Sequence, residues 1–176
     1  MRCVSFQRIY LAGPDVFRPD AAEHGRRVVA LCAQHGFEAV FPLESALPTG
    51  LPPQALARHI YQANIAHIAA CDAVLANLEF FRGPEPDSGT CFEVGYAIAR
   101  GKAVIGYLPD AGSLAQRIRQ RHPRAAGEGL RDSAGWELEE FGLPLNLMLA
   151  VPCRIVVGGP RAALDALRLQ RDAKEN

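Results

Sequence analysis

The sequence predicts an α/β fold, a single doubly wound sheet of five parallel strands with helices on both faces. Apolar runs alternate with segments of helical spacing along the chain, which is typical of a parallel sheet covered by helices. Residues 73–78 form a nearly continuous apolar run, as expected for a buried strand. The 176 residues, 49% hydrophobic and 22% charged, suit one globular domain spanning residues 1–176.

Five strands are predicted from short apolar runs that end at turn residues. The pair Gly13-Pro14 stops the first run, Pro42 the second and Pro109 the fourth. The strands are expected at residues 9–11, 37–41, 72–78, 102–107 and 154–157.

Helices are predicted where apolar residues recur on one face or where capping residues occur. A helix of about 16 residues opens at Pro19 and Asp20 and ends at Gly36, a typical C-cap. Another follows the loop of residues 83–93, in which Asp87 is the expected N-cap. The remaining helices are expected at residues 54–70, 114–120, 136–141 and 160–174.

The strand order follows from the handedness of the connections. Right-handed crossovers leave few arrangements of five parallel strands, and the flavodoxin-like order 2-1-3-4-5 is the natural one. In this order the winding direction reverses between the first and third strands, and ligands bind at the carboxyl ends of strands beside such a reversal. The sequence therefore predicts a binding crevice between residues 10–17 and 77–93.

Composition argues against several classes of partner. Nineteen basic residues balance nineteen acidic ones, so no net charge favours nucleic acid or an anionic membrane. The basic run from Arg117 to Arg124 is expected to be a solvated surface. No signal-peptide pattern occurs, and no apolar run approaches the roughly 20 residues that cross a bilayer. A cytoplasmic protein with a small-molecule ligand is expected.

No metal or cofactor is expected either. The five cysteines are scattered and form no CxxC pair or Cys/His cluster, which predicts reduced thiols. Cys91 is the exception, because a thiol at a helix N-terminus is expected to have a lowered pKa. Neither a GxGxxG motif nor a P-loop is present, which argues against a dinucleotide site or a P-loop phosphate site.

The loop of residues 83–93 brings two carboxylates to the predicted crevice. Asp87 is expected to cap the helix and to retain acceptor capacity for a ligand hydroxyl. Glu93 is expected to be ionised, because it lies near the positive end of the helix dipole. An ionised carboxylate can attack an electrophilic sugar carbon, and a hydrogen bond from Tyr10 can orient it. The alternative is that Glu93 only improves the helix N-terminus and that Tyr10 is packing.

Five motifs, which occur in the same order as in the nucleoside 2-deoxyribosyltransferase family, make the chain resemble that family. The most specific is D-x-G-T-x-x-E-x-G-Y-A at residues 87–97, and the others lie at 9–14, 71–78, 81–84 and 145–149. The resemblance runs from about Ile9 to Leu149, which is most of the chain. Its implied fold is the one that the strand pattern predicts.

The resemblance implies a double displacement on a 2′-deoxynucleoside. Glu93 would attack C1′ and release the base, and a second nucleobase or water would resolve the ester. Tyr10 would orient Glu93, Asp87 would bind the sugar hydroxyls, and Phe17 would pack on the base. Asn146 would reach the 5′-hydroxyl in the site of a neighbouring subunit, which implies a homo-oligomer with shared sites. The further substrate contacts that we expect are Gly13, Ser88, Gly89 and Met148.

One position departs from the family pattern. The characterised transferases place an aspartate in the second helix, where it handles the proton of the departing base, and Asn64 stands at that position here. A neutral amide can bind a base edge but cannot act as an acid or base near pH 7. Asp72 is expected to be a turn residue at the opposite end of the sheet. Glu44, His59 or solvent remain as sources of the proton.

Three rival functions stay open. A 2′-deoxynucleoside 5′-monophosphate N-hydrolase shares the fold, but a carboxylate at Asp87 would repel a phosphate dianion. Cytokinin-type phosphoribohydrolases share a G-T-x-x-E core but usually have two glycines where this chain has Pro86 to Ser88. A non-catalytic nucleoside or nucleotide sensor would be consistent with Asn64. Base preference, transfer against hydrolysis, oligomer size and the role of residues 110–133 are not determined by the sequence.

Overall fold

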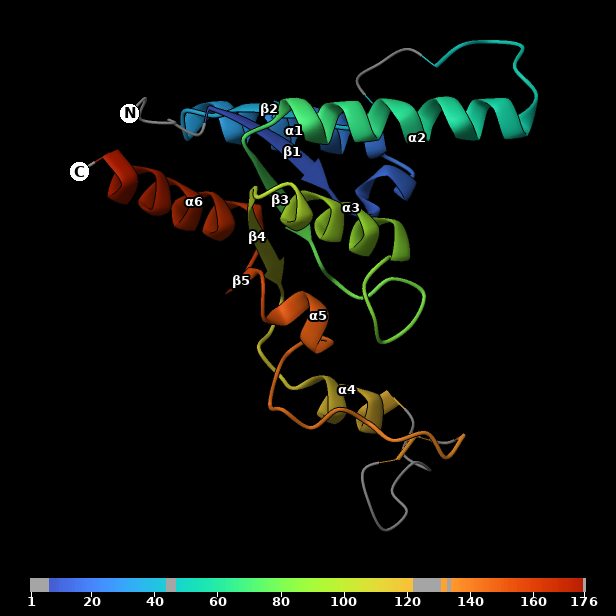
Figure 1. Cartoon of the computed structure of the whole chain (residues 1–176), viewed down its shortest axis with the longest axis vertical. Helices are drawn as coiled ribbons and strands as arrows, with labels where there is room; N and C mark the ends of the chain where they lie inside the picture. Colours follow the sequence, from blue (N-terminus) through green and yellow to red (C-terminus); the bar gives the residue numbers. More distant parts are fainter. Residues whose placement is uncertain (1–6, 44–46, 122–130, 133, 176) are drawn as a thin grey trace.

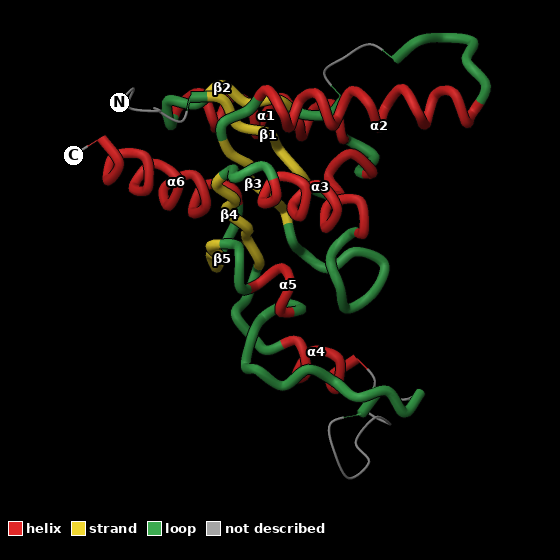
Figure 2. The backbone as a smooth tube through the Cα atoms, viewed as in Figure 1, coloured by secondary structure: helices red, strands yellow, loops and turns green. Residues whose placement is uncertain are grey.

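The computed structural model describes residues 7–43, 47–121, 131–132 and 134–175. Its core is a five-stranded sheet in the order β2-β1-β3-β4-β5, and all four pairings are parallel. The predicted fold class and strand order are therefore confirmed. The strands, yellow in Figure 2, are β1 (Arg8–Ala12), β2 (Glu38–Val40), β3 (Ala73–Asn77), β4 (Ala103–Leu108) and β5 (Arg154–Val157).

Helices connect the strands and begin close to the positions that the sequence predicts. Asp20 precedes the first helix, and Gly36, with φ +78°, lies just beyond its end in the left-handed region that favours glycine. Asp87 caps the helix after β3 by accepting a hydrogen bond from the Thr90 N–H at 2.9 Å. The helices are α1 (Ala21–Gln34), α2 (Pro53–Ala70), α3 (Ser88–Ala99), α4 (Leu114–Arg121), α5 (Leu147–Ala150) and α6 (Pro160–Glu175), with a 3-10 turn, η1 (Pro14–Phe17).

Two apolar layers sandwich the sheet. On one face, Ile9 and Leu11 of β1 pack with residues of α1 and α6. On the other face, Tyr10 packs with residues of α2, α3 and α5. Alternate residues of one strand thus enter opposite layers, as the two-residue period of a strand requires. Figure 1 shows α2, α3 and α5 in front of the strands. Within the described ranges, no helix is long and apolar enough to cross a membrane.

The helix predicted at residues 136–141 is absent. Trp136 is 74% exposed, and residues 131 and 137 pair instead as an isolated antiparallel bridge. The Asp132 carboxylate accepts hydrogen bonds from the N–H groups of Ala134 and Trp136, at 2.8 and 2.9 Å. Such side-chain bonds to nearby backbone compete with helix formation, which explains the wrong prediction.

The prediction of a solvated basic run is wrong at Arg117. This residue lies in α4, which extends away from the sheet beyond α5 in Figure 1, and it is only 7% exposed. Its guanidinium lies 4.1 Å from the Phe80 ring centroid, pairs with Asp110 at 3.1 Å and donates to the Pro144 carbonyl. Arg117 therefore joins the extended segment to the loop after β3. His122 and Arg124 lie outside the described residues.

Gly25 tests the tight packing of α1 on the sheet. A Cβ atom at this buried position would lie 2.4 Å from the Phe41 ring, so the ring or the helix would have to shift. We expect Gly25→Ala to lower the free energy of unfolding by about 1–3 kcal/mol because of overpacking. Urea unfolding followed by circular dichroism measures this change.

Gly95 in α3 is the matched control, because nothing lies within 4 Å of a Cβ placed there. Alanine has the higher helix propensity, so Gly95→Ala is expected to leave stability unchanged or to raise it by up to about 1 kcal/mol. Equal destabilisation by both substitutions would contradict the packing argument.

Candidate active site

A cavity of about 290 Å³ opens where the sequence predicts a crevice, at the carboxyl ends of β1 and β3. Its polar lining comes from α2 and from the start of α3, and consists of Asn64, Asp87, Thr90 and Glu93. Its apolar lining comes from η1, from the segment after β2 and from α2, and consists of Val16, Phe17, Pro42, Leu43, Leu47 and Ile60. The cavity therefore has one acidic wall and one apolar wall, a combination typical of sites for small organic ligands.

Glu93 lies at the centre of the acidic wall and receives two hydrogen bonds. The Tyr10 hydroxyl donates to Glu93 Oε1 at 2.6 Å, and Asn64 Nδ2 donates to the same oxygen at 3.4 Å. Strand β1, helix α2 and helix α3 thus each supply one of these side chains. The structure therefore brings together Glu93, the Tyr10 hydroxyl expected to orient it, and Asn64, which stands where the family has its proton-handling aspartate.

Burial controls the ionisation of this group. It raises the pKa of Glu93 to about 7, with the charge of Asp87 acting in the same direction and the bonds from Tyr10 and Asn64 opposing it. The expectation that the helix dipole keeps Glu93 ionised is therefore wrong in direction, because desolvation is the larger effect. Burial, together with the charge of Glu93, also raises the pKa of Tyr10, so its hydroxyl remains a hydrogen-bond donor.

Asp87 combines its structural position with access to the cavity. Its Oδ2 atom accepts from both the backbone N–H and the hydroxyl of Thr90, at 2.9 and 3.1 Å. Both of these capping bonds use one oxygen of the carboxylate. Gly89 also lines the cavity, and a Cβ there would lie 3.0 Å from Asp87 Oδ2. The glycine therefore lets the helix start lie close to the carboxylate.

Gly13 lines the cavity where the carboxyl ends of β1 and β3 come together. A Cβ at Gly13 would lie 2.8 Å from Asn77 Cβ, closer than real side chains pack. Asn77 is buried, donates to Asp15 Oδ2 at 2.9 Å and accepts from the Glu79 N–H at 3.1 Å. Asp15 also pairs with His24 at 3.2 Å. This network links the two loops that border the cavity, and Phe17 lies on one of them.

Three expected substrate contacts are not in this cavity. Ser88 is exposed at the start of α3, and Met148 is 72% exposed on α5. Asn146 caps α5 by accepting from the Met148 N–H at 3.0 Å and donates to Glu139 at 2.7 Å. The lone amide in an apolar run thus has local partners of its own.

Other sequence expectations have clear outcomes. Asp72 accepts hydrogen bonds from the backbone N–H groups of Gln7 and Arg8, at 3.0 and 2.9 Å, and so has the structural position expected of it. Burial raises the pKa of Cys91, with the charges of Glu85 and Asp87 adding to it, so the expected lowering is wrong. Glu44 lies outside the described residues, and His59 is exposed on α2.

Apart from Phe17, the residues of the apolar wall were missed by sequence reasoning, and so was Thr90. Ile60 precedes Asn64 by four residues in α2, so helical periodicity alone places the two on one face. Thr90 belongs to the D-x-G-T motif itself. By contrast, Leu43 and Leu47 come from irregular chain, in which no periodicity predicts the direction of a side chain.

Two comparisons match most of the chain. The family model described as nucleoside 2-deoxyribosyltransferase matches residues 9–148. The structure of a 2-desoxiribosyltransferase from Leishmania mexicana is similar to this chain with a TM-score of 0.71 and 33% identity, over 93% of this chain and 97% of that one.

Two further similarities are more limited. A conserved protein from Enterococcus faecalis has the same fold, with a TM-score of 0.60 and 20% identity over 96% of this chain and 99% of that one. An uncharacterized protein from Schizosaccharomyces pombe is 29% identical over 126 residues, which are 70% of this chain but only 60% of that protein's length. With the match over residues 9–148 and the similarity to the Leishmania enzyme, the chain belongs to the nucleoside 2-deoxyribosyltransferase family.

Proposed function

We propose that this protein cleaves the N-glycosidic bond of 2′-deoxynucleosides through a covalent deoxyribosyl ester on Glu93. The observation that supports this most directly is the convergence of Tyr10 and Asn64 on one oxygen of Glu93 within the cavity. Two donors on Oε1 fix the carboxylate and leave Oε2 as the attacking atom. Membership of the family supports the same class of reaction.

The reaction proceeds in two displacements. Glu93 Oε2 forms a bond to C1′ as the bond from C1′ to the base nitrogen breaks, and the bonding electron pair leaves with the base, which takes up a proton. A nitrogen of a second base, or water, then attacks C1′ and releases the carboxylate. Asp87 accepts hydrogen bonds from the sugar hydroxyls through the oxygen that does not cap α3.

Asn64 does not supply the leaving-group proton, because an amide has no acidic group near pH 7. In the structure, Asn64 donates a hydrogen bond to Glu93. The departing base therefore receives its proton from solvent, from a proton-donating group of the substrate, or from a residue of a second subunit. Cleavage is then expected to be most efficient for bases that leave readily.

The charge of the cavity favours the nucleoside over its 5′-monophosphate. Among the described residues that line it, two are carboxylates, Asp87 and Glu93, and none is lysine or arginine. A phosphate dianion near these carboxylates would be repelled and would find no cationic partner there. The apolar wall, including Phe17 and Ile60, suits the faces of a nucleobase.

Mass spectrometry of the intact protein incubated with a 2′-fluoro-2′-deoxynucleoside tests the nucleophile. The fluorine slows hydrolysis of the ester, so the mass is expected to rise by one fluorodeoxyribosyl group located on Glu93. Glu93→Gln should acquire no adduct and release base at least 10³-fold more slowly from natural substrates.

Parallel assays with nucleosides and their 5′-monophosphates separate the rival functions. A strong preference for the monophosphate would contradict the charge argument and favour the nucleotide hydrolase. Binding of nucleosides without base release, equal in the wild type and Glu93→Ala, would favour the sensor.

The pKa of Glu93 predicts the pH dependence of the reaction. Because the nucleophile must be ionised, kcat/KM is expected to rise about tenfold per pH unit below about 7 and to level off above it. The effect on stability has the opposite sign. Because the pKa of Glu93 is raised in the folded state, protonation of this carboxyl favours folding. Its contribution to the free energy of unfolding is therefore present at acid pH and is lost as pH rises through about 7.

Paired measurements check both signs. The Glu93→Gln variant should lose the stability change between pH 4.5 and 7, which is on the order of 3 kcal/mol, and should be the more stable protein at pH 8. A kcat/KM profile that is flat between pH 5 and 8 would contradict the assignment, as would a stability profile that is the same in both proteins.

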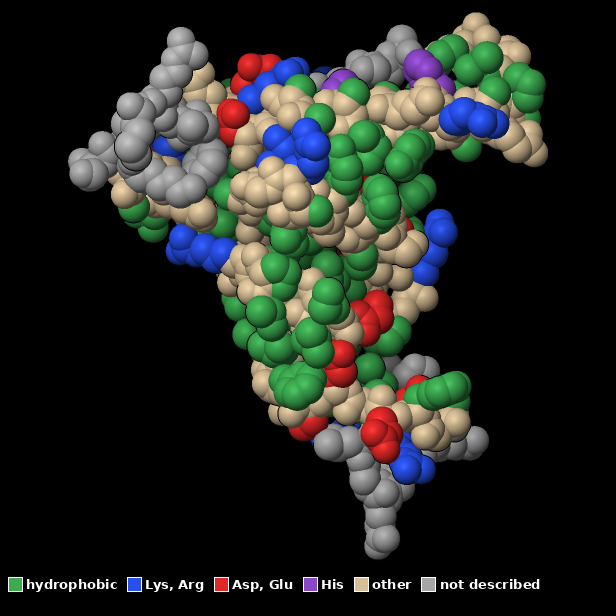
Figure 3. All heavy atoms as spheres, viewed as in Figure 1, with side chains coloured by type: hydrophobic (Ala, Val, Ile, Leu, Met, Phe, Trp, Pro, Cys, Tyr) green, Lys and Arg blue, Asp and Glu red, His purple; other side chains and the backbone are tan. Residues whose placement is uncertain are grey.

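We also propose a homo-oligomer in which Asn146 and Met148 complete the cavity of a neighbouring copy. On the face shown in Figure 3, hydrophobic side chains gather over α2, α3 and α5. Exposed apolar residues on these helices include Tyr61, Phe92 and Met148, at 55%, 52% and 72% exposure, and Val151, directly after α5, is 71% exposed. A contiguous apolar area of this kind is typical of an interface.

Complementation tests this arrangement. Glu93→Ala and Asn146→Ser are each expected to have low activity, and serine keeps a side chain that can cap α5. If the sites are shared, mixing and re-equilibrating the two variants should restore about a quarter of the wild-type activity in a dimer, through the one intact site of each mixed pair. Light scattering that shows a monomer, or a mixture without recovery, would contradict the proposal.

A further inference from the structure

Beside the cavity, Phe17 contacts two side chains of the loop between β3 and α3. Its ring stacks on Phe81, with the centroids 5.3 Å apart and the planes 18° from parallel. The guanidinium of Arg82 lies 5.4 Å from the Phe17 centroid and 4.5 Å from the Phe81 centroid. These are distances at which aromatic pairs and cation–π contacts are favourable.

The three distances show which side of Phe17 is occupied. Groups on opposite sides of one ring would be separated by about twice the stacking distance, yet Arg82 and Phe81 are only 4.5 Å apart. Both therefore lie on the same side of Phe17. Phe17 also lines the cavity and is 56% exposed, so the contacts with Arg82 and Phe81 do not cover it. The ring is thus supported on one side and available to a ligand on the other.

The loop holds Arg82 in an unfavourable backbone conformation. Its φ of +59° is the only positive value among the described residues other than glycine. The base of the loop is closed, because Phe80 pairs with Pro86 and the Phe81 N–H donates to the Glu85 carbonyl at 3.0 Å. The Arg82 side chain is exposed to solvent, so its burial does not offset the backbone strain. The contacts with the two rings are the compensating interaction that the structure shows.

We propose that Arg82, together with Phe81, is a positioning residue that holds Phe17 as a rigid platform for the base of the substrate. This rests on the proposed function, in which Phe17 packs on a nucleobase. A side chain as exposed as Phe17 would otherwise have to be ordered when the ligand binds, at a cost to affinity. Arg82 itself touches neither the base nor the reacting atoms. Its removal should therefore weaken binding and leave the chemical step unchanged.

The strained backbone makes Arg82→Gly a decisive variant. Glycine adopts φ +59° without strain, so the variant should unfold at the same temperature as the wild type or higher. The same change removes the guanidinium from the rings. We expect KM for base release from 2′-deoxynucleosides to rise roughly three- to tenfold, with kcat within about twofold of the wild type. Phe81→Leu should behave similarly, and Arg82→Lys, which keeps the charge without the flat face, should be intermediate.

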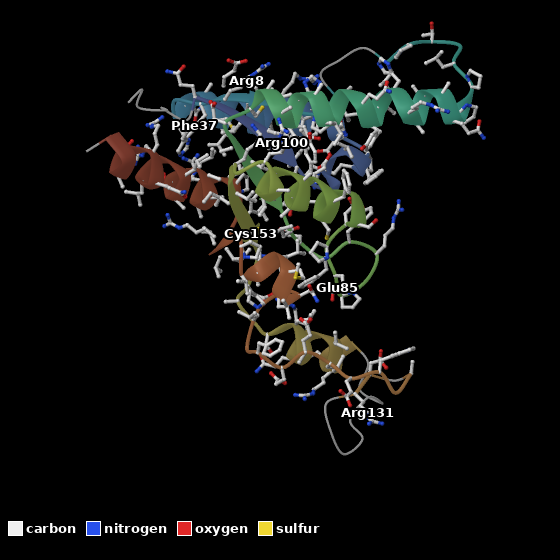
Figure 4. The ribbon with its side chains drawn as sticks, in the orientation of Figure 1. Arg8, Phe37, Glu85, Arg100, Arg131 and Cys153 are labelled. Carbon is white, nitrogen blue, oxygen red and sulfur yellow. The ribbon has the colours of Figure 1, made fainter. Side chains whose placement is uncertain are left out.

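Arg100→Gly is the matched control. Arg100 is exposed at the C-terminal end of α3, remote from the loop in Figure 4, and has a φ of −89°. This substitution is expected to lower the unfolding temperature slightly and to leave KM unchanged. An unchanged KM in Arg82→Gly would overturn the proposal. A fall in kcat and unfolding temperature together with the rise in KM would also overturn it, because the loop would then be merely structural.

Binding measured without catalysis separates this proposal from the proposed function. Calorimetry gives the Kd of 2′-deoxyadenosine, 2′-deoxycytidine and thymidine for Glu93→Gln and for Glu93→Gln combined with Arg82→Gly. If the wild type releases no base, the proposed function fails, and weaker binding by the double variant still supports the platform. Equal Kd values for the two proteins, or no binding to either, would overturn it.

Discussion

A partly buried hydrogen bond from Tyr10 to Glu93 joins an inner strand of the sheet to the helix that bears the carboxylate in the cavity. Tyr10 is fully buried in the layer beneath α2, α3 and α5, and the bond is 2.6 Å long. The position of β1 in the sheet thereby orients the Glu93 carboxylate. The same burial raises its pKa to about 7, so precise placement and easy ionisation oppose each other at this residue. Hydrogen bonds from Tyr10 and Asn64 offset part of that conflict.

The two ends of the sheet have different tasks. At the amino-terminal end, Asp72 accepts hydrogen bonds from the backbone N–H groups of Gln7 and Arg8 at the start of β1, and Lys102 donates to the carbonyls of Ala69 and Cys71. These contacts close the connections around β3 and satisfy backbone groups. At the carboxyl end, Gly13 and Asn77 bring two loops together around an open cavity. Polar side chains at the amino-terminal end therefore stabilise the connections between strands. At the carboxyl end, the polar side chains that line the cavity are accessible to a ligand.

The loop between β3 and α3 is attached on both sides. Arg82 contacts Phe17 and Phe81 near the cavity, while Arg117 lies against Phe80 from the extended segment that includes α4. Two arginines thus pack on aromatic rings of one short loop, with opposite exposures. The buried Arg117 is paired with Asp110, because an unpaired buried charge would be costly. The loop that leads to Asp87 and Glu93 is therefore connected to both Phe17 at the cavity and the α4 segment.

The fold class, the strand order and the meeting of Tyr10 with Glu93 could all be predicted from the sequence. Strand periodicity, turn residues and right-handed crossovers are local or general rules, and they place both side chains at one edge of the sheet. The local rules failed where distant contacts prevail. Tertiary packing alone accounts for the raised pKa values of Glu93 and Cys91, where burial outweighs the helix dipole, and for the burial of Arg117. It alone brought Arg82 to the back of Phe17, because packing between loops of irregular chain has no period in the sequence.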